Sequence, residues 1–140
     1  MHPTIKKLMS IITGLLFFIS AHAQFWTAAD LGIVADGVTD QTAALQTAFS
    51  DPDVQTIWFS NKTSSGTALF VINGTLSVPG GKVLKFEAGN RLIGHGTING
   101  GIIDASMQSW IFGDSLTVNL RSTSQGWVSA KWFGAVGAGG

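Results

Sequence analysis

Short apolar runs of three to five residues alternate with Gly, Asn, Pro and Ser from residue 57 to residue 118. The runs are rich in β-branched and aromatic residues, which is the pattern of short β-strands joined by tight turns. Inward and outward residue types alternate through 82–86, as expected for a strand with one buried face. The expected strands are 56–59, 68–72, 75–78, 82–86, 91–93, 97–98, 101–103, 110–112 and 117–120.

One segment has the spacing of a helix instead. Asp40 is a suitable N-cap, and Asp51 precedes a proline, which disfavours helical geometry. The sequence therefore predicts a short amphipathic helix within 40–50, preceded by a strand over 31–34 and a tight turn at Asp36-Gly37. The apolar face of this helix would consist of Ala44, Leu45, Ala48 and Phe49.

Two architectures accommodate short strands of this kind. A β-sandwich would use longer antiparallel strands and two-residue hairpins, for which Asn73-Gly74 is suited. A parallel β-helix would stack short strands with Gly-rich corners between them, and Asn99-Gly100-Gly101 could form a corner in either fold. Strands of only three or four residues favour the β-helix.

The segment from residue 30 to residue 49 resembles the opening of pectate-lyase-like β-helix proteins. In that superfamily a strand is followed by Asp-Gly-x-Thr-Asp and then by a helix containing Ala-Ala-Ile-Gln-x-Ala. Leu45 replaces the Ile, and Gln41 stands where a second Asp is common. The matching residues are Asp36, Gly37, Thr39, Asp40, Thr42, Ala43, Ala44, Gln46 and Ala48.

The resemblance implies an all-β, right-handed parallel β-helix whose first strands are covered by the amphipathic helix. Such a helix would bury the apolar interior and the unpaired backbone groups at that end. Asp36, Gly37, Thr39 and Asp40 are then expected to be structural rather than catalytic, because Gly accepts positive φ and Asp accepts orphan helix N–H groups.

The N-terminal residues 1–23 have the pattern of a cleaved secretory signal. Lys6 and Lys7 precede an apolar run over 8–19, and small residues stand before the boundary between Ala23 and Gln24. A run of about a dozen residues is too short to span a bilayer, so no membrane association is expected after cleavage. We therefore expect a secreted, periplasmic or cell-surface protein.

The C-terminal residues 131–140 resemble the opening strand a second time. The spacing of Gly32, Val34 and Gly37 recurs at Gly134, Val136 and Gly139. Ala138, however, stands where the motif has Asp. This predicts a region 24–130 followed by the truncated start of a second β-helix module, with a Gly-rich tail as the alternative.

Composition narrows the classes of partner. Charged residues make up 11 % of the chain and Lys and Arg do not cluster, which excludes a phosphate-binding surface and hence nucleic acid. There is no Cys, so disulfides cannot stabilise the fold. No cofactor is evident and no metal site is expected, although the resemblance implies that a full-length lyase of this superfamily could bind calcium. The sequence leaves the oligomeric state open.

Most local motifs do not point to chemistry. Gly113-Asp114-Ser115-Leu116 matches a short serine esterase signature, but a strand rather than a helix is expected after it. His95 is interpreted as a lone turn residue, since one His cannot build a metal site. Trp110 and Trp127 are the candidate sugar-contacting residues, whereas Trp58 and Trp132 are expected in the core.

The export signal and the resemblance together predict a polysaccharide-degrading lyase or glycoside hydrolase, or a polysaccharide-binding protein. No catalytic motif is found in the chain, so we expect the chain alone not to be catalytic. A non-catalytic surface adhesin or tail-spike-like structural protein is the main alternative, and a small glycan-binding β-sandwich is the third. Fold alone does not decide among them.

Overall fold

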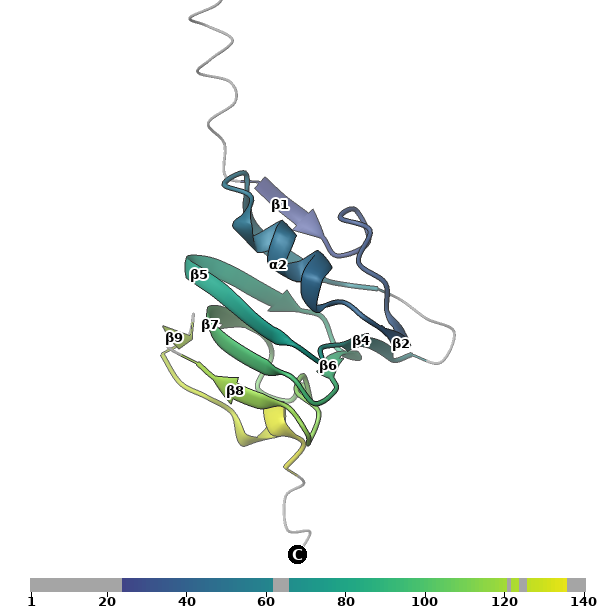
Figure 1. Ribbon diagram of the computed structural model, residues 1–140. Coiled ribbons are helices and arrows are strands. Elements are labelled where there is room, and N and C mark those ends of the chain that lie inside the picture. Colours follow the sequence, from purple (N-terminus) through teal and green to yellow (C-terminus); the bar gives the residue numbers. More distant parts are fainter. Residues whose placement is uncertain (1–23, 62–65, 121, 124–125, 136–140) are drawn as a thin grey trace, which may run out of the picture.

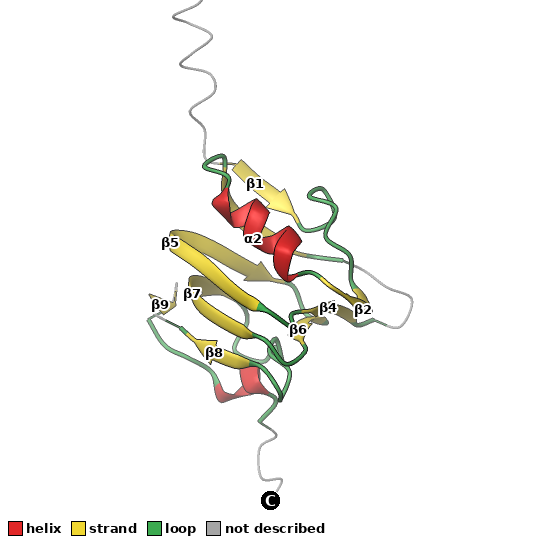
Figure 2. Ribbon diagram, viewed as in Figure 1, coloured by secondary structure: helices red, strands yellow, loops and turns green. Residues whose placement is uncertain are grey.

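The computed structural model describes residues 24–61, 66–120, 122–123 and 126–135. Figure 1 shows one helix beside a stack of strands, and Figure 2 shows the same view by secondary structure. The elements are β1 (Gln24–Thr27), β2 (Asp36–Asp40), α2 (Thr42–Ser50), β3 (Val54–Phe59), β4 (Ala68–Val71), β5 (Thr75–Phe86), β6 (Asn90–Ile93), β7 (Thr97–Asp104), β8 (Thr117–Asn119), β9 (Ser122–Thr123) and the 3₁₀ helix η1 (Ala130–Phe133).

The strands form two parallel sheets. The larger has six strands in the order β1-β3-β5-β7-β8, with β9 also paired to β7, and the smaller has the order β2-β4-β6. From β1 to β7 the chain alternates between the two sheets, so each strand pairs with the strand two places along the chain. All the strand pairings between described residues are parallel, which rules out the sandwich with an Asn73-Gly74 hairpin.

The predicted fold class, an all-β right-handed parallel β-helix, is wrong. The described residues form a mixed α/β structure in which one helix lies beside two separate, open parallel sheets. The physical reason is that short strands bounded by Gly reveal strand length and the positions of turns. They do not determine whether the sheets join into a coil, and parallel sheets of either kind contain the same apolar runs.

The helix lies where its periodicity predicts, and α2 buries Leu45, Ala48 and Phe49. Ala44, expected on the same face, is exposed. The N-cap is Gln41 rather than Asp40, although the Asp40 carboxylate still accepts a hydrogen bond from the first helical N–H, that of Thr42, at 3.0 Å. The backbone becomes extended at Asp51, immediately before the proline.

The opening strand differs from its prediction. Residues 31 and 32 lie in a turn, residues 33–35 form neither helix nor strand, and β2 begins later, at Asp36. Gly37 has φ of +72°, as a tight turn requires, and yet the flanking Asp36 and Asp40 pair with Leu69 and Val71 of β4. The predicted turn at Asp36-Gly37 is therefore built into the strand as a register irregularity.

The core contains the inward side chains of both sheets together with the apolar face of α2. Phe59 and Phe86 are adjacent in register on β3 and β5, and their rings stack with centroids 4.6 Å apart. Phe70 from the smaller sheet meets Phe59 edge-on at 5.0 Å. Aromatic contacts thus connect the two sheets across the interior.

The described part of the C-terminal segment, residues 131–135, is not a strand. Ala130–Phe133 form η1, which places Trp132 fully inside the core, as its apolar context predicts. Trp58, expected in the core, is only half-buried. Residues 1–23 and 136–140, to which the signal and the end of the predicted second module belong, lie outside the described residues. Among the described residues, no helix is long and apolar enough to cross a membrane.

Candidate functional site

A groove crosses β5, β7 and β8, the strands that follow one below the other in Figure 1. Its volume is about 1010 Å³, which is at the upper end of the range for ligand pockets. It is lined by Ser77, Val78, Pro79, Gly80, Gly81, Asn99, Gly100, Gly101, Ile102, Val118, Asn119 and Leu120.

The hollow follows from a change of register in the larger sheet. Val78 pairs with Gly100, and the next pair is Val83 with Ile102, so residues 79–82 of β5 lie opposite Gly101 alone. Gly100 and Gly101 have φ of +83° and +84°, and an added Cβ on Gly101 would lie 2.6 Å from the Leu84 side chain. Only Gly fits this bend without strain.

A row of polar side chains runs along the groove. Ser77, Asn99 and Asn119 are in register on β5, β7 and β8. The side-chain amide of Asn119 donates a hydrogen bond from Nδ2 to Oδ1 of Asn99 at 2.8 Å. The amides of β7 and β8 are therefore held in a common orientation, which preorganises the row.

A second polar row runs parallel to the first. Thr75, Thr97 and Thr117 are also in register, and each lies two residues before a member of the Ser77–Asn99–Asn119 row. Residues two apart on a strand share a face, so both rows lie on the same side of the sheet. The outer surface of these strands is a small, uncharged array of hydroxyl and amide groups.

The helix fixes one end of the array. Gln46 of α2 donates from Nε2 to the carbonyl oxygen of Ser77 and accepts at Oε1 from its N–H, both at 2.9 Å. The side-chain amide thus replaces a neighbouring strand at this edge of β5. At the opposite side, β8 lies beyond β7 as the outer strand of the sheet.

None of the described residues that line the groove carries an ionisable side chain. Its chemistry is that of hydroxyl and amide groups, exposed backbone beside Gly, and a few apolar side chains. Such a lining can hydrogen-bond to a neutral polar ligand, but it offers no proton donor or acceptor of suitable pKa for acid–base catalysis.

Asp36, Gly37, Thr39 and Asp40, the motif residues expected to be structural, do not line this groove. Asp36 accepts hydrogen bonds from the N–H of Val38 at 2.9 Å, and from the N–H and hydroxyl of Thr39 at 2.8 and 2.5 Å. These bonds, above all that of the Thr39 hydroxyl, lower the pKa of Asp36 below its usual 3.8. The carboxylate organises the turn around Gly37.

The Asp40 carboxylate also accepts several hydrogen bonds, but from two separate segments of the chain. Its Oδ1 accepts from the hydroxyl of Thr42 at 2.6 Å and from the N–H of Asn73 at 3.2 Å. The hydrogen bonds from Thr42 lower the pKa of the Asp40 carboxyl. Asp40 therefore links the start of α2 to the connection between β4 and β5.

The two candidate sugar-contacting residues are engaged by protein groups. The Arg91 guanidinium carbon lies 3.9 Å from the centroid of the Trp110 ring, and the Trp110 Nε1 donates to the Phe112 carbonyl oxygen at 2.7 Å. Trp127 is half-buried, with its ring centroid 5.5 Å from that of Trp132. The structure brings neither ring into the groove, and their sugar-contact role remains a prediction.

A second hollow collects His95, Asp114 and Ser115. Strand β8, not a helix, follows Ser115, so the context that the serine esterase signature requires is absent from the described residues. Within the described part of the chain, no three His, Cys, Asp or Glu residues gather as potential metal ligands.

The polar residues of the groove were not predicted from the sequence, although a recurring pattern marks them. A Thr-apolar-Ser/Asn triplet begins at positions 75, 97 and 117, once in each strand that lines the groove. A search for triplets recurring at about twenty residues would have found the two rows. The pattern is weak because the middle residue varies and turns of unequal length separate the copies.

A scan of protein-family models and searches of curated proteins and of solved structures found no match to this chain.

Proposed function

We propose that this protein binds polysaccharide outside the cytoplasm, through the groove across β5, β7 and β8. The observation that carries the proposal is the in-register row of Ser77, Asn99 and Asn119 along a groove without ionisable lining groups. The secretory pattern of residues 1–23 and the resemblance of residues 30–49 to pectate-lyase-like proteins support the same conclusion from the sequence.

The chemistry of the lining suits sugars. Sugar hydroxyls donate and accept hydrogen bonds, and hydroxyl and amide side chains can serve both roles. Gly80 and Gly81 are exposed lining residues without side chains, so they leave the backbone open to close approach, whereas Val78 and Val118 lie on the core side of their strands. A few fixed polar groups within a partly apolar cleft are typical of a ligand site.

Binding rather than cleavage fits this groove. Glycoside hydrolysis by the usual routes requires two carboxyl groups flanking the scissile bond, and eliminative cleavage requires a base near the ring proton. The described lining residues supply neither. We therefore propose a binding activity for this chain and assign it no reaction.

The proposal is tested by affinity gel electrophoresis against a panel of soluble plant and bacterial polysaccharides. At least one should retard the wild-type protein, and Asn99→Ala should reduce the retardation. Gln108→Ala is the matched control, because Gln108 is an exposed amide residue that does not line the groove. Retardation that Asn99→Ala and Gln108→Ala leave equally unchanged would refute the groove as the binding site.

A further inference from the structure

We infer that the ligand is an uncharged, extended β-1,4-linked polysaccharide that crosses the strands and places one sugar unit on each of β5, β7 and β8. This inference rests on the proposed function and specifies the ligand class and its direction in the groove. Three observations support it: the register of the polar row, the hydrogen-bonding groups that the row leaves free, and the engagement of Lys82 and Lys85 with other protein groups.

The register sets the direction of the ligand. Ser77, Asn99 and Asn119 are direct neighbours on adjacent strands, so the row runs perpendicular to the strands. Adjacent strands are about 4.8 Å apart, close to the advance of one pyranose unit in an extended β-1,4-linked chain. A chain lying along the row would therefore present a new sugar unit at each strand.

The three positions of the row offer different hydrogen-bonding groups. Asn99 uses Oδ1 to accept from Asn119, which leaves the Nδ2 hydrogens of Asn99 and the Oδ1 of Asn119 available to a ligand. The hydroxyl of Ser77, an exposed residue, can donate or accept. Successive strands thus offer a hydroxyl, a donor and an acceptor, and sugar hydroxyls can satisfy each of them.

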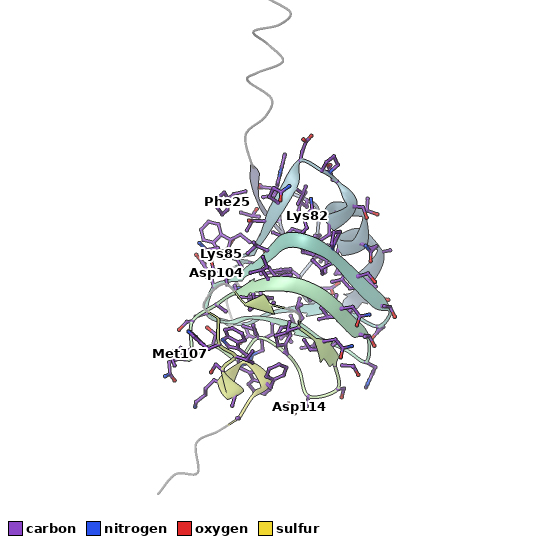
Figure 3. The ribbon with its side chains drawn as sticks, turned by 90° about the vertical axis from the view of Figure 1, so that its left-hand side faces the viewer. Phe25, Lys82, Lys85, Asp104, Met107 and Asp114 are labelled. Atoms are coloured by element: carbon purple, nitrogen blue, oxygen red, sulfur yellow. The ribbon has the colours of Figure 1, made fainter. Side chains whose placement is uncertain are left out.

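The lysines that the structure describes on β5 favour a neutral polymer over a polyuronate. The two lysines of β5 are engaged elsewhere: Lys82 is buried and donates from Nζ to the carbonyl oxygens of Asp51 and Val54, at 2.8 and 2.5 Å. Lys85 pairs with Asp104 at 3.8 Å, and Figure 3 shows both on the same side of the molecule. A uronate carboxylate in the groove would lose water without gaining either lysine as a counter-ion.

Among the described residues the row has three positions, because α2 closes it beside β5 and β8 is the outer strand at the other end. Gln46 occupies both main-chain groups of Ser77, where a further strand would otherwise pair. Affinity should therefore rise as an oligosaccharide lengthens from two to three units, and then change little. This dependence on length distinguishes a chain across the strands from one bound through a single sugar.

Isothermal titration calorimetry on the full chain tests the inference with cello-oligosaccharides, xylo-oligosaccharides and manno-oligosaccharides of two to six units. Cellouronate oligomers of the same lengths are the matched charged probes, because they differ from the cello-oligosaccharides only in carrying a carboxylate at C6. A neutral series should bind with an affinity that levels off at about three units, one per strand position. Cellouronates should bind at least about tenfold more weakly, and Asn99→Ala should weaken neutral binding about three- to tenfold.

The possible failures are distinguishable. Equal or tighter binding of cellouronates that still depends on Asn99 would overturn the neutral ligand and leave the proposed function standing. Affinity that keeps rising to six units would overturn the arrangement of one sugar per strand. Failure of every oligosaccharide in the calorimeter and of every polysaccharide in the gel assay would overturn both the inference and the proposed function.

Discussion

Gln46 of α2 forms two hydrogen bonds with the main chain of Ser77 in β5, one to its carbonyl oxygen and one from its N–H, each 2.9 Å long. A side-chain amide thereby satisfies a donor and an acceptor that a neighbouring strand would otherwise pair. The same contact fixes the first position of the polar row in the groove. The Gln46–Ser77 contact is therefore expected both to stabilise the fold and to position the proposed binding site.

Gln46→Ala should destabilise the protein, because it leaves both main-chain groups of Ser77 without a protein partner. We expect a loss of about 1–2 kcal/mol in the free energy of unfolding, measured by urea denaturation. Thr47→Ala, at an exposed helix position next to it, is the control and should change stability by less than about 0.5 kcal/mol. Equal changes in the free energy of unfolding for the two variants would show that the Gln46–Ser77 hydrogen bonds do not contribute to stability.

Lys82→Met should be more damaging than Lys85→Met. The Lys82 ammonium is buried and donates to the carbonyl oxygens of Asp51, which follows α2, and Val54, which begins β3, so its loss removes a partner from each of them. This should cost about 1–3 kcal/mol. Lys85 is 40 % exposed and paired at the surface, and its substitution should cost no more than about 1 kcal/mol. Chemical denaturation of both variants decides the order, and a reversed order would contradict this role of Lys82.

Gly101→Ala should destabilise the bend that forms the groove. Gly101 has φ of +84°, and a Cβ there would collide with Leu84, so the expected loss is about 1–3 kcal/mol. Gly80 also lines the groove, but its Cβ would meet open space, and Gly80→Ala should be nearly neutral. Thermal unfolding of the two variants compares them directly. A Gly101→Ala protein as stable as the wild type would show that the bend does not need Gly.

Acid should weaken the link that Asp40 makes between α2 and the connection after β4. The pKa of Asp40 is lower in the folded state than its usual 3.8, because it accepts hydrogen bonds from Thr42. A lowered carboxyl pKa gives stability that is present above the unfolded-state value and is lost as the pH falls through the folded-state value. The melting temperature of the wild type should therefore fall below about pH 4.

Asp40→Asn isolates this contribution, since the amide can still accept a hydrogen bond but carries no charge. The variant should be less stable at neutral pH and should lose less stability on acidification, with the wild type and Asp36→Asn measured alongside. Parallel acid profiles of wild type and Asp40→Asn would contradict the assignment.

Local features of this fold could be predicted from the sequence, whereas its architecture could not. The spacing of Leu45, Ala48 and Phe49 predicts α2, and the alternation at Leu84 and Phe86 predicts a buried face of β5. These patterns depend only on neighbouring residues. The β-helix prediction was wrong because closure of the sheets depends on contacts between distant strands, which strand length and Gly spacing do not encode.

The same limit applies to the site. The sequence predicts sugar contacts at Trp110 and Trp127 because their rings are flat and aromatic, but Arg91 and Trp132 lie against these rings. Burial of the Lys82 ammonium could not be foreseen, because its acceptors are main-chain carbonyls that no sequence motif marks. The polar row exists only once parallel pairing aligns Asn99 with Asn119, and that alignment is a property of the sheet.

The most direct test of the central claim is NMR titration of the protein with a neutral β-1,4-linked oligosaccharide of four units, the length just past the expected plateau. The side-chain amide signals of Asn99 and Asn119, and the main-chain signals of Gly81, Gly100 and Gly101, should shift together with a common saturation curve (all line the groove). Shifts confined to the indole signals of Trp110 or Trp127, with the groove unchanged, would contradict the account.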